Sequence, residues 1–219
     1  MDLANRCEPA PRAYARGGPA TAIRATARAL ARVDNARAVV LVAGISDQLA
    51  LAAAAVVRDR DLDAEQIVIV PIGGAHAIGR VLTGLAPLRP RLRLAGLCDL
   101  REEEVFRRGL IASGIGTPRT RTDLERLGFF VCVNDLEEEL IRAVGPAGVE
   151  ALLAAHGDLR TFRSFQSQPA WRGQESLPQL WRFLRSSSRR IQRYAPLLVE
   201  AAEVRDGMPR PLAALLDAI

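Results

Sequence analysis

Two carboxylates in this sequence stand just beyond short apolar runs. Asp47 comes soon after the run 38–42 (AVVLV), and Asp99 directly follows the run 92–98 (LRLAGLC). Such runs are typical of buried parallel strands, whose carboxyl ends meet at the sheet edge where ligand sites are built. Because carboxylate oxygens are preferred ligands of Mg²⁺, the pattern suggests a divalent-metal site between two strand ends. Asp47 is explained equally well as an acid at the positive end of a helix dipole.

Further acids follow the third and fourth apolar runs. Glu102 and Glu103 come shortly after Asp99, while Asp135 and Glu137 come after the run GFFVCV. Acids are favoured in the first turn of any helix, and Asp135 is also a candidate N-cap, so these residues have an explanation that needs no metal. That explanation fits Asp99 least well, because a carboxylate directly after a buried strand is costly unless something pairs with it.

A glycine pair, Gly73 and Gly74, follows the apolar run 66–71 and precedes His76. Glycines allow the backbone to approach an anion closely, and the N–H groups of the next helix could bind a phosphate. A tight turn between a strand and a helix also needs glycines for its own sake. His76 is either a phosphate contact or a plain surface residue, and the sequence leaves both interpretations open.

The basic residues of the chain are all arginine. The 219-residue sequence has 30 of them and no lysine, and its formal net charge is +5. Without lysine no Walker A phosphate loop can form, so we expect no ATP binding, and no lysine can act as a base. The positive charge weakly favours a polyanionic partner such as DNA.

The C-terminal part interleaves arginines with aromatic residues. Guanidinium groups bind phosphate and aromatic rings stack on bases, so this pattern suits a polynucleotide. The alternative is that the aromatic side chains form a local core and the arginines solvate it. The candidate nucleic-acid contacts are Arg182, Arg185, Arg189, Arg190 and Arg193.

The alternation of apolar runs with helical periodicity predicts the elements that would position these residues. Strands are expected at 38–42, 66–71, 92–98 and 128–133, and helices at 20–33, 47–58, 75–85, 102–112 and 136–144. This order predicts an α/β fold with a Rossmann-like core, a four-stranded parallel sheet flanked by helices. We divide the chain into an N-terminal extension with one helix (1–36), the core (37–156) and a helical, arginine-rich C-terminal extension (157–219).

The sequence also indicates a compartment. No run approaches the roughly 18 apolar residues that a membrane span needs, and the N-terminus lacks the apolar core of a signal peptide. The three cysteines, Cys7, Cys98 and Cys132, are widely spaced and are interpreted as small apolar residues in a reducing environment. We therefore expect a cytoplasmic protein without a membrane partner.

Five segments, taken in order, resemble the TOPRIM domain of the OLD (overcoming lysogenisation defect) family of nucleases. They are AGISDQLAL (43–51), PIGGAHAIGR (71–80), LAGLCD (94–99), GFFVCVNDLEEEL (128–140) and SRRIQRYAPLLVEA (188–201). Residues 38 to about 145 match the TOPRIM core, and the rest resembles the helical extension of OLD-type members. The resemblance implies a stand-alone TOPRIM protein without the ATPase domain that usually accompanies it.

What the resemblance implies for function is Mg²⁺- or Mn²⁺-dependent hydrolysis of DNA phosphodiesters. Asp99 matches the first acid of the family's Asp-x-Asp motif, and Asp47 matches a further acidic position. The metal ligands implied in this way are Asp47, Asp99, Glu102, Glu103, Asp135 and Glu137. Arg190 lies near the position of a catalytic cation that is usually lysine.

The sequence departs from the family pattern at two acids. Ala43 stands where the first motif has glutamate, and Arg101 stands where the second aspartate of Asp-x-Asp is expected. A methyl group can neither bind a metal nor move a proton. The sequence therefore leaves two hypotheses, a weakened DNA endonuclease or a catalytically silent module that binds nucleic acid or a partner protein. It also leaves open a homodimer or a separate protein partner.

Overall fold

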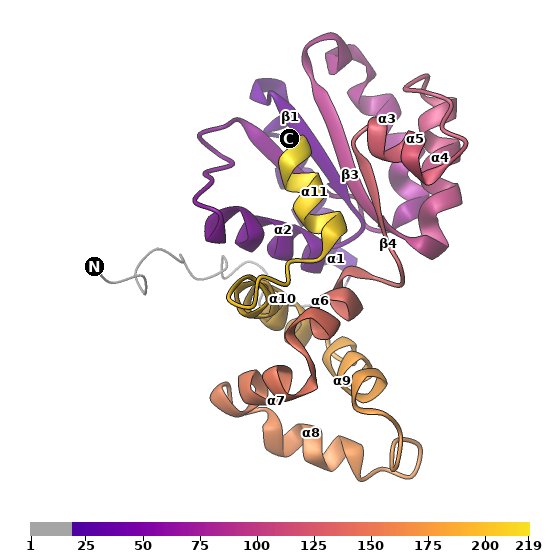
Figure 1. Cartoon of the computed structure of the whole chain (residues 1–219). Coiled ribbons are helices and arrows are strands. Elements are labelled where there is room, and N and C mark those ends of the chain that lie inside the picture. The colour runs from indigo at the N-terminus through magenta and orange to yellow at the C-terminus, as the bar shows by residue number, and fades with distance from the viewer. Residues whose placement is uncertain (1–18) are drawn as a thin grey trace.

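A four-stranded parallel sheet forms the centre of the computed structural model, which describes residues 19–219 (Figure 1). The strand order is β2-β1-β3-β4. The register places Val42 beside Pro71 and Leu97, and Asp99 beside Cys132, so the carboxyl ends of all four strands lie along one edge. We call it the carboxyl edge. The strands are β1 (Ala38–Val42), β2 (Ile67–Pro71), β3 (Arg93–Asp99) and β4 (Phe129–Cys132).

Helices cover both faces of the sheet, which confirms the predicted α/β class. Strands with two covered faces need apolar side chains at every position, and all five residues of β1 are buried. One face carries α1 (Pro19–Leu30), α3 (Ile78–Leu85), α4 (Glu103–Ala112) and α5 (Arg121–Arg126). The other carries α2 (Ile45–Val57), α6 (Leu136–Val144), α10 (Ser188–Glu203) and α11 (Arg210–Ala218).

Three helices form a lobe that projects beyond the carboxyl edge (Figure 1). These are α7 (Pro146–Ala155), α8 (Leu159–Gln166) and α9 (Ser176–Arg185), and we call them the helical lobe. Its helices pack on one another and on α6. The lobe therefore faces the part of the sheet where the predicted site lies.

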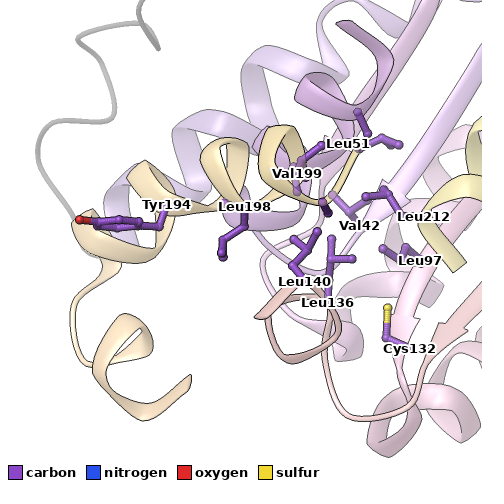
Figure 2. Close-up of a cluster of buried hydrophobic side chains, with 14 of the residues drawn as sticks. Val42, Leu51, Leu97, Cys132, Leu136, Leu140, Tyr194, Leu198, Val199 and Leu212 are labelled. Carbon is purple, nitrogen blue, oxygen red and sulfur yellow. The ribbon is translucent and has the colours of Figure 1, made fainter. Parts of the chain in front are cut away.

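The last two helices leave the lobe and return to the sheet. Leu198 and Val199 of α10 and Leu212 of α11 point into the same buried cluster as Val42 and Leu97 of the sheet (Figure 2). Residues 157–219 are helical, as predicted. They include two helices of the lobe, α8 and α9, and two helices that complete the core, α10 and α11.

The strands lie within one residue of their predicted bounds, and several helix bounds differ. Helix α2 begins at Ile45, two residues early, because Gly44 is its N-cap and Asp47 binds the cap's backbone. Helices α5 and α7 lie where we predicted none. α5 has only six residues, too few for periodicity to show.

Cys98 and Cys132 are buried in the sheet, and burial raises the pKa of both thiols, so they act as apolar side chains. Cys7 and the other residues of 1–18 lie outside the described residues. None of the described helices is long and apolar enough to cross a membrane.

Candidate metal centre

The fold brings five carboxylates together at the carboxyl edge. Asp99 ends β3, and Glu102 follows it in a 3₁₀ turn, Leu100–Glu102. Asp47 lies in the first turn of α2 after β1, while Asp135 caps α6 after β4 and Glu137 is in the first turn of α6. Since β3 pairs with both β1 and β4, these acids converge although the sequence separates them. We call them the acid cluster.

Asp47 is held at the start of α2 by the backbone. The Gly44 N–H donates to Asp47 Oδ2 at 2.8 Å, which orients the carboxylate. This bond favours the charged form, yet burial and the nearby charges of Glu137, Asp99 and Glu102 raise the pKa of Asp47 well above its usual value. Binding of a proton or a cation at Asp47 would therefore relieve the unfavourable burial of its negative charge.

The pKa of Asp99 is also subject to opposing influences. Burial, followed by the charges of Glu102, Asp135 and Glu137, raises the pKa of Asp99 to about 7. Arg185 acts in the opposite direction and lowers it. A carboxylate that titrates near neutrality beside other acids is a common signature of a functional site.

Glu102 has a polar atom without a partner. Its Oε2 is buried and accepts no hydrogen bond from the residues that the structure describes. A buried carboxylate oxygen left in this way costs free energy unless a cation or donor satisfies it. The charge of Glu102 acts on Asp99 and Asp47, so a positive ion is the group that would best complete the surroundings of this atom.

Asp135 and Glu137 are paired, unlike the other members. Asp135 accepts from the Glu138 N–H as an N-cap and from Trp181 Nε1, both at 2.8 Å, and forms an ion pair with Arg185. Arg185 Nη1 also lies 3.4 Å from Glu137 Oε2. Burial and then Asp135 raise the pKa of Glu137.

The residues present fit a divalent cation. The donor set is all oxygen, as Mg²⁺ and Mn²⁺ prefer, and one or two carboxylates completed by water can suffice. Within the described part of the chain, no three acidic, histidine or cysteine side chains already stand close enough to share one ion. Asp47, Asp99 and Glu102 influence one another electrostatically at distances longer than a metal–ligand bond, so their side chains would have to rotate to hold one ion.

Two hollows flank the acid cluster. One, of about 440 Å³, lies between the carboxyl edge and α9, with Asp99 and Glu102 on one wall and Trp181 on the other. The second, of about 450 Å³, lies between α1, the start of α2 and the start of α10. Arg185 borders both hollows, so solvent ions can approach the cluster from either side.

Glu103 does not join the cluster. It is ion-paired with Arg107 at 2.6 Å and with Arg121 at 3.2 Å. The first turn of α4 directs Glu103 to these arginines, and among the predicted ligands it has the clearest structural role. Glu102, one residue earlier, is the acid of this pair that couples to Asp99.

The glycine turn after β2 has a backbone role. Gly73 and Gly74 have φ values of 76° and 111°, which favour glycine, and the Gly74 N–H donates to the Ala43 carbonyl at 3.0 Å. That N–H is therefore used within the fold. His76 is exposed in the 3₁₀ turn that follows.

Three of the five candidate DNA-binding arginines have partners inside the protein. Arg185 pairs with the acid cluster, and Arg193 pairs with Asp158. The Arg190 guanidinium lies 3.9 Å from the centre of the Phe183 ring and donates to the Phe183 carbonyl at 2.8 Å. Burial lowers the pKa of Arg190.

Arg182 and Arg189 are exposed. Of the five candidates, these two arginines are the most available for an external phosphate.

The phenylalanines of the lobe form its core. Phe162 and Phe183 are buried, and their ring centres are 5.1 Å apart. Phe165 lies 5.0 Å from Trp171 and 5.6 Å from Phe183. These rings pack against one another, which agrees with the alternative in which the aromatics stabilise the lobe.

The sequence did not reveal the link between α9 and the acid cluster. Trp181 and Arg185 reach Asp135 across 46 and 50 residues of chain. No local pattern marks such a contact, since it depends on how the lobe packs against α6.

Comparisons with known proteins agree with this architecture. Residues 36–91 match the family model described as overcoming lysogenization defect protein-like, TOPRIM domain. The C-terminal region of the Burkholderia pseudomallei OLD protein superposes with a TM-score of 0.56 at 17% identity, over 84% of this chain and 98% of that one.

The C-terminal region of the Xanthomonas campestris pv. campestris OLD protein gives a TM-score of 0.54 at 21% identity, over 83% of this chain and 96% of that one. At these identities the likeness to the solved structures is one of fold. A comparison with curated proteins gives no match.

Proposed function

We propose that the chain binds a divalent metal ion at the carboxyl edge and hydrolyses phosphodiester bonds of DNA there. The match of residues 36–91 to the OLD-like TOPRIM family model and the likeness in fold to OLD C-terminal regions support this proposal. TOPRIM domains in general bind divalent metal ions. The proposal places Mg²⁺ or Mn²⁺ at Asp47, Asp99 and Glu102, with water completing the coordination.

The observation that carries this proposal is the unbalanced charge of those three acids. Asp47 and Asp99 have raised pKa values because burial and neighbouring acids disfavour their charged forms. Within residues 19–219, Glu102 Oε2 has no hydrogen-bond partner. A divalent cation removes the repulsion and satisfies the unpartnered oxygen, so the metal-bound state should be the stable one near neutral pH.

A bound metal would neutralise the scissile phosphate and lower the pKa of a bound water. The chain itself orients the ligands: the Gly44 N–H holds Asp47, and the end of β3 holds Asp99. Ala43 adds no acid or base. Loss of such a group typically costs about 10² to 10⁴ in rate, so we expect a slow enzyme.

DNA would be bound across the hollow between the carboxyl edge and the lobe. Arg182 on α9 and Arg189 on α10 are exposed and provide cations for phosphate contacts. Their two helices follow one another in the chain, joined near Arg185, which borders the hollow.

Two observations favour a second candidate, a catalytically silent module that binds DNA or a protein. Ala43 stands where the first motif has glutamate, and Arg185 already supplies one positive charge to Asp135 and Glu137. In this alternative the fold and the arginines are retained while the chemistry is lost.

A nicking assay on supercoiled plasmid decides between the two. Native protein and Asp99→Asn are compared with Mg²⁺, with Mn²⁺ and with EDTA. Metal-dependent nicking that is lost in Asp99→Asn supports the nuclease. DNA binding without nicking supports the silent module, and equal nicking by both proteins would exclude Asp99 as the site.

A further inference from the structure

Arg185 is placed where the acid cluster meets the helical lobe. It is the last residue of α9, and its Nη1 contacts both Asp135 Oδ2 and Glu137 Oε2. The guanidinium carbon lies 5.1 Å from the centre of the Trp181 ring, and the Trp181 N–H donates to the same Asp135 oxygen. One helix therefore delivers both a cation and a hydrogen-bond donor to the cluster.

These contacts divide the cluster. Asp135 and Glu137, which we call the paired half, have a positive charge in direct contact. Asp47, Asp99 and Glu102, which we call the open half, form no ion pair with any residue of 19–219, and Glu102 Oε2 accepts no hydrogen bond from that part of the chain. The protein thus compensates one half of the cluster itself and leaves the other to a ligand.

We propose that Arg185 is a resident counter-ion that excludes a divalent cation from the paired half, so that metal binds only at the open half. The statement about the open half rests on the proposed function. The exclusion of a cation from the paired half rests on the contacts of Arg185 alone.

Burial makes this pairing more than a surface ion pair. Asp135 is 5% exposed and Glu137 is 7% exposed, so neither carboxylate is compensated well by water. Removing one partner of a buried pair leaves an uncompensated charge that strongly favours any replacement cation. The neighbouring acid Glu138 is already paired with Arg142 and bound by Asn134, so Arg142 is committed elsewhere.

The position of Arg185 also allows a solvent ion to take the place of its guanidinium. The Arg185 side chain is 40% exposed and borders both hollows. A hydrated ion can therefore reach the paired half once the guanidinium is absent. A shorter neutral side chain at this position opens space without altering Asp135 or Glu137.

The test is Mn²⁺ binding to the whole chain, measured by isothermal titration calorimetry at pH 7.5. The variants are Arg185→Gln, Arg185→Lys, and Arg185→Gln combined with Glu137→Gln. Arg160→Gln is the matched control, since Arg160 is an exposed arginine of the same lobe outside the cluster. No variant needs to be active for the measurement.

We expect Arg185→Gln to bind one more Mn²⁺ than the native chain and to bind the first ion roughly tenfold more tightly, because a nearby positive charge is removed. Arg185→Lys and Arg160→Gln should match the native chain. Adding Glu137→Gln should remove the extra ion. Unchanged stoichiometry and affinity in a folded Arg185→Gln would overturn the inference.

The outcomes separate this inference from the proposed function. If the native chain binds no Mn²⁺ and Arg185→Gln gains an ion that Glu137→Gln removes, the proposed function fails and the resident counter-ion stands. If the native chain and Arg185→Gln bind the same number of Mn²⁺ ions, at least one, with equal affinity, the counter-ion fails and metal binding stands; if neither binds Mn²⁺, both fail. If Arg185→Gln is unfolded in EDTA, millimolar Mn²⁺ should restore its circular dichroism, and failure to restore it would overturn the counter-ion.

Discussion

Replacing Asp99 by asparagine should stabilise the metal-free protein above neutral pH. Asparagine has nearly the same shape but no charge, so it removes the repulsion that Asp99 experiences. The pKa of Asp99 rises from its usual 3.8 to about 7, first through burial and then through Glu102, Asp135 and Glu137. At 1.36 kcal/mol per unit this difference is about 4 kcal/mol. Because the side chain is only half-buried, solvent screening reduces it to roughly 2–3 kcal/mol.

The pH dependence has a definite sign. Between the unfolded and folded pKa values, the folded protein binds a proton at Asp99 that the unfolded chain has lost, so native stability falls as pH rises. The loss is small near pH 4 and complete above about pH 7. The advantage of Asp99→Asn over the native chain should therefore grow across this window and then become constant.

The measurement is thermal unfolding in EDTA at pH 4.5 and pH 8. For a chain of this size, 2–3 kcal/mol corresponds to roughly 5–10 °C in Tm. Asp217→Asn, at a carboxylate whose side chain is 79% exposed, is the matched control and should change little. Millimolar Mg²⁺ should raise the Tm of the native chain at pH 8 but not that of Asp99→Asn. If Asp99→Asn is no more stable than native at pH 8, the electrostatic reasoning is wrong.

Three further predictions concern the missing glutamate, the exposed arginines and the lobe core. Ala43→Glu should tighten Mn²⁺ binding and increase nicking, because the residue lies just beyond β1 at the carboxyl edge; a folded variant that gains neither argues that the site cannot be rebuilt there. Arg182→Ala with Arg189→Ala should lower the log–log salt slope of duplex DNA binding by about 1.8, at about 0.9 per phosphate, and an unchanged slope would assign both side chains to solvent. Phe162→Ala should cost about 3–5 kcal/mol in urea unfolding, since the ring is buried against Phe183, and a loss under 1 kcal/mol would contradict that packing.

The sequence was informative about the sheet because its signals are local. Each apolar run predicts a strand within its own few residues, and the helices between the runs require the strands to be parallel. The positions of Asp47 and Asp99 after two runs then follow from chain direction alone. These features identified the α/β fold and the edge that carries the acids.

The sequence could not distinguish the roles of adjacent residues of similar type. Glu102 couples to Asp99, whereas Glu103 pairs with Arg107. Arg189 is exposed, while its neighbour Arg190 packs on Phe183. Successive residues of a helix point about 100° apart, so which of two adjacent side chains meets the site depends on the rotation of the helix against its neighbours.

The charge compensation of the acid cluster was decided by tertiary packing. Asp135 and Glu137 receive their counter-ion from Arg185, whose helix is separated from them in sequence by α7 and α8. The acids themselves could be predicted, since each follows a strand. Their counter-ion could not be predicted. Arg185 reaches the carboxyl edge only because the apolar face of α9 packs on α6.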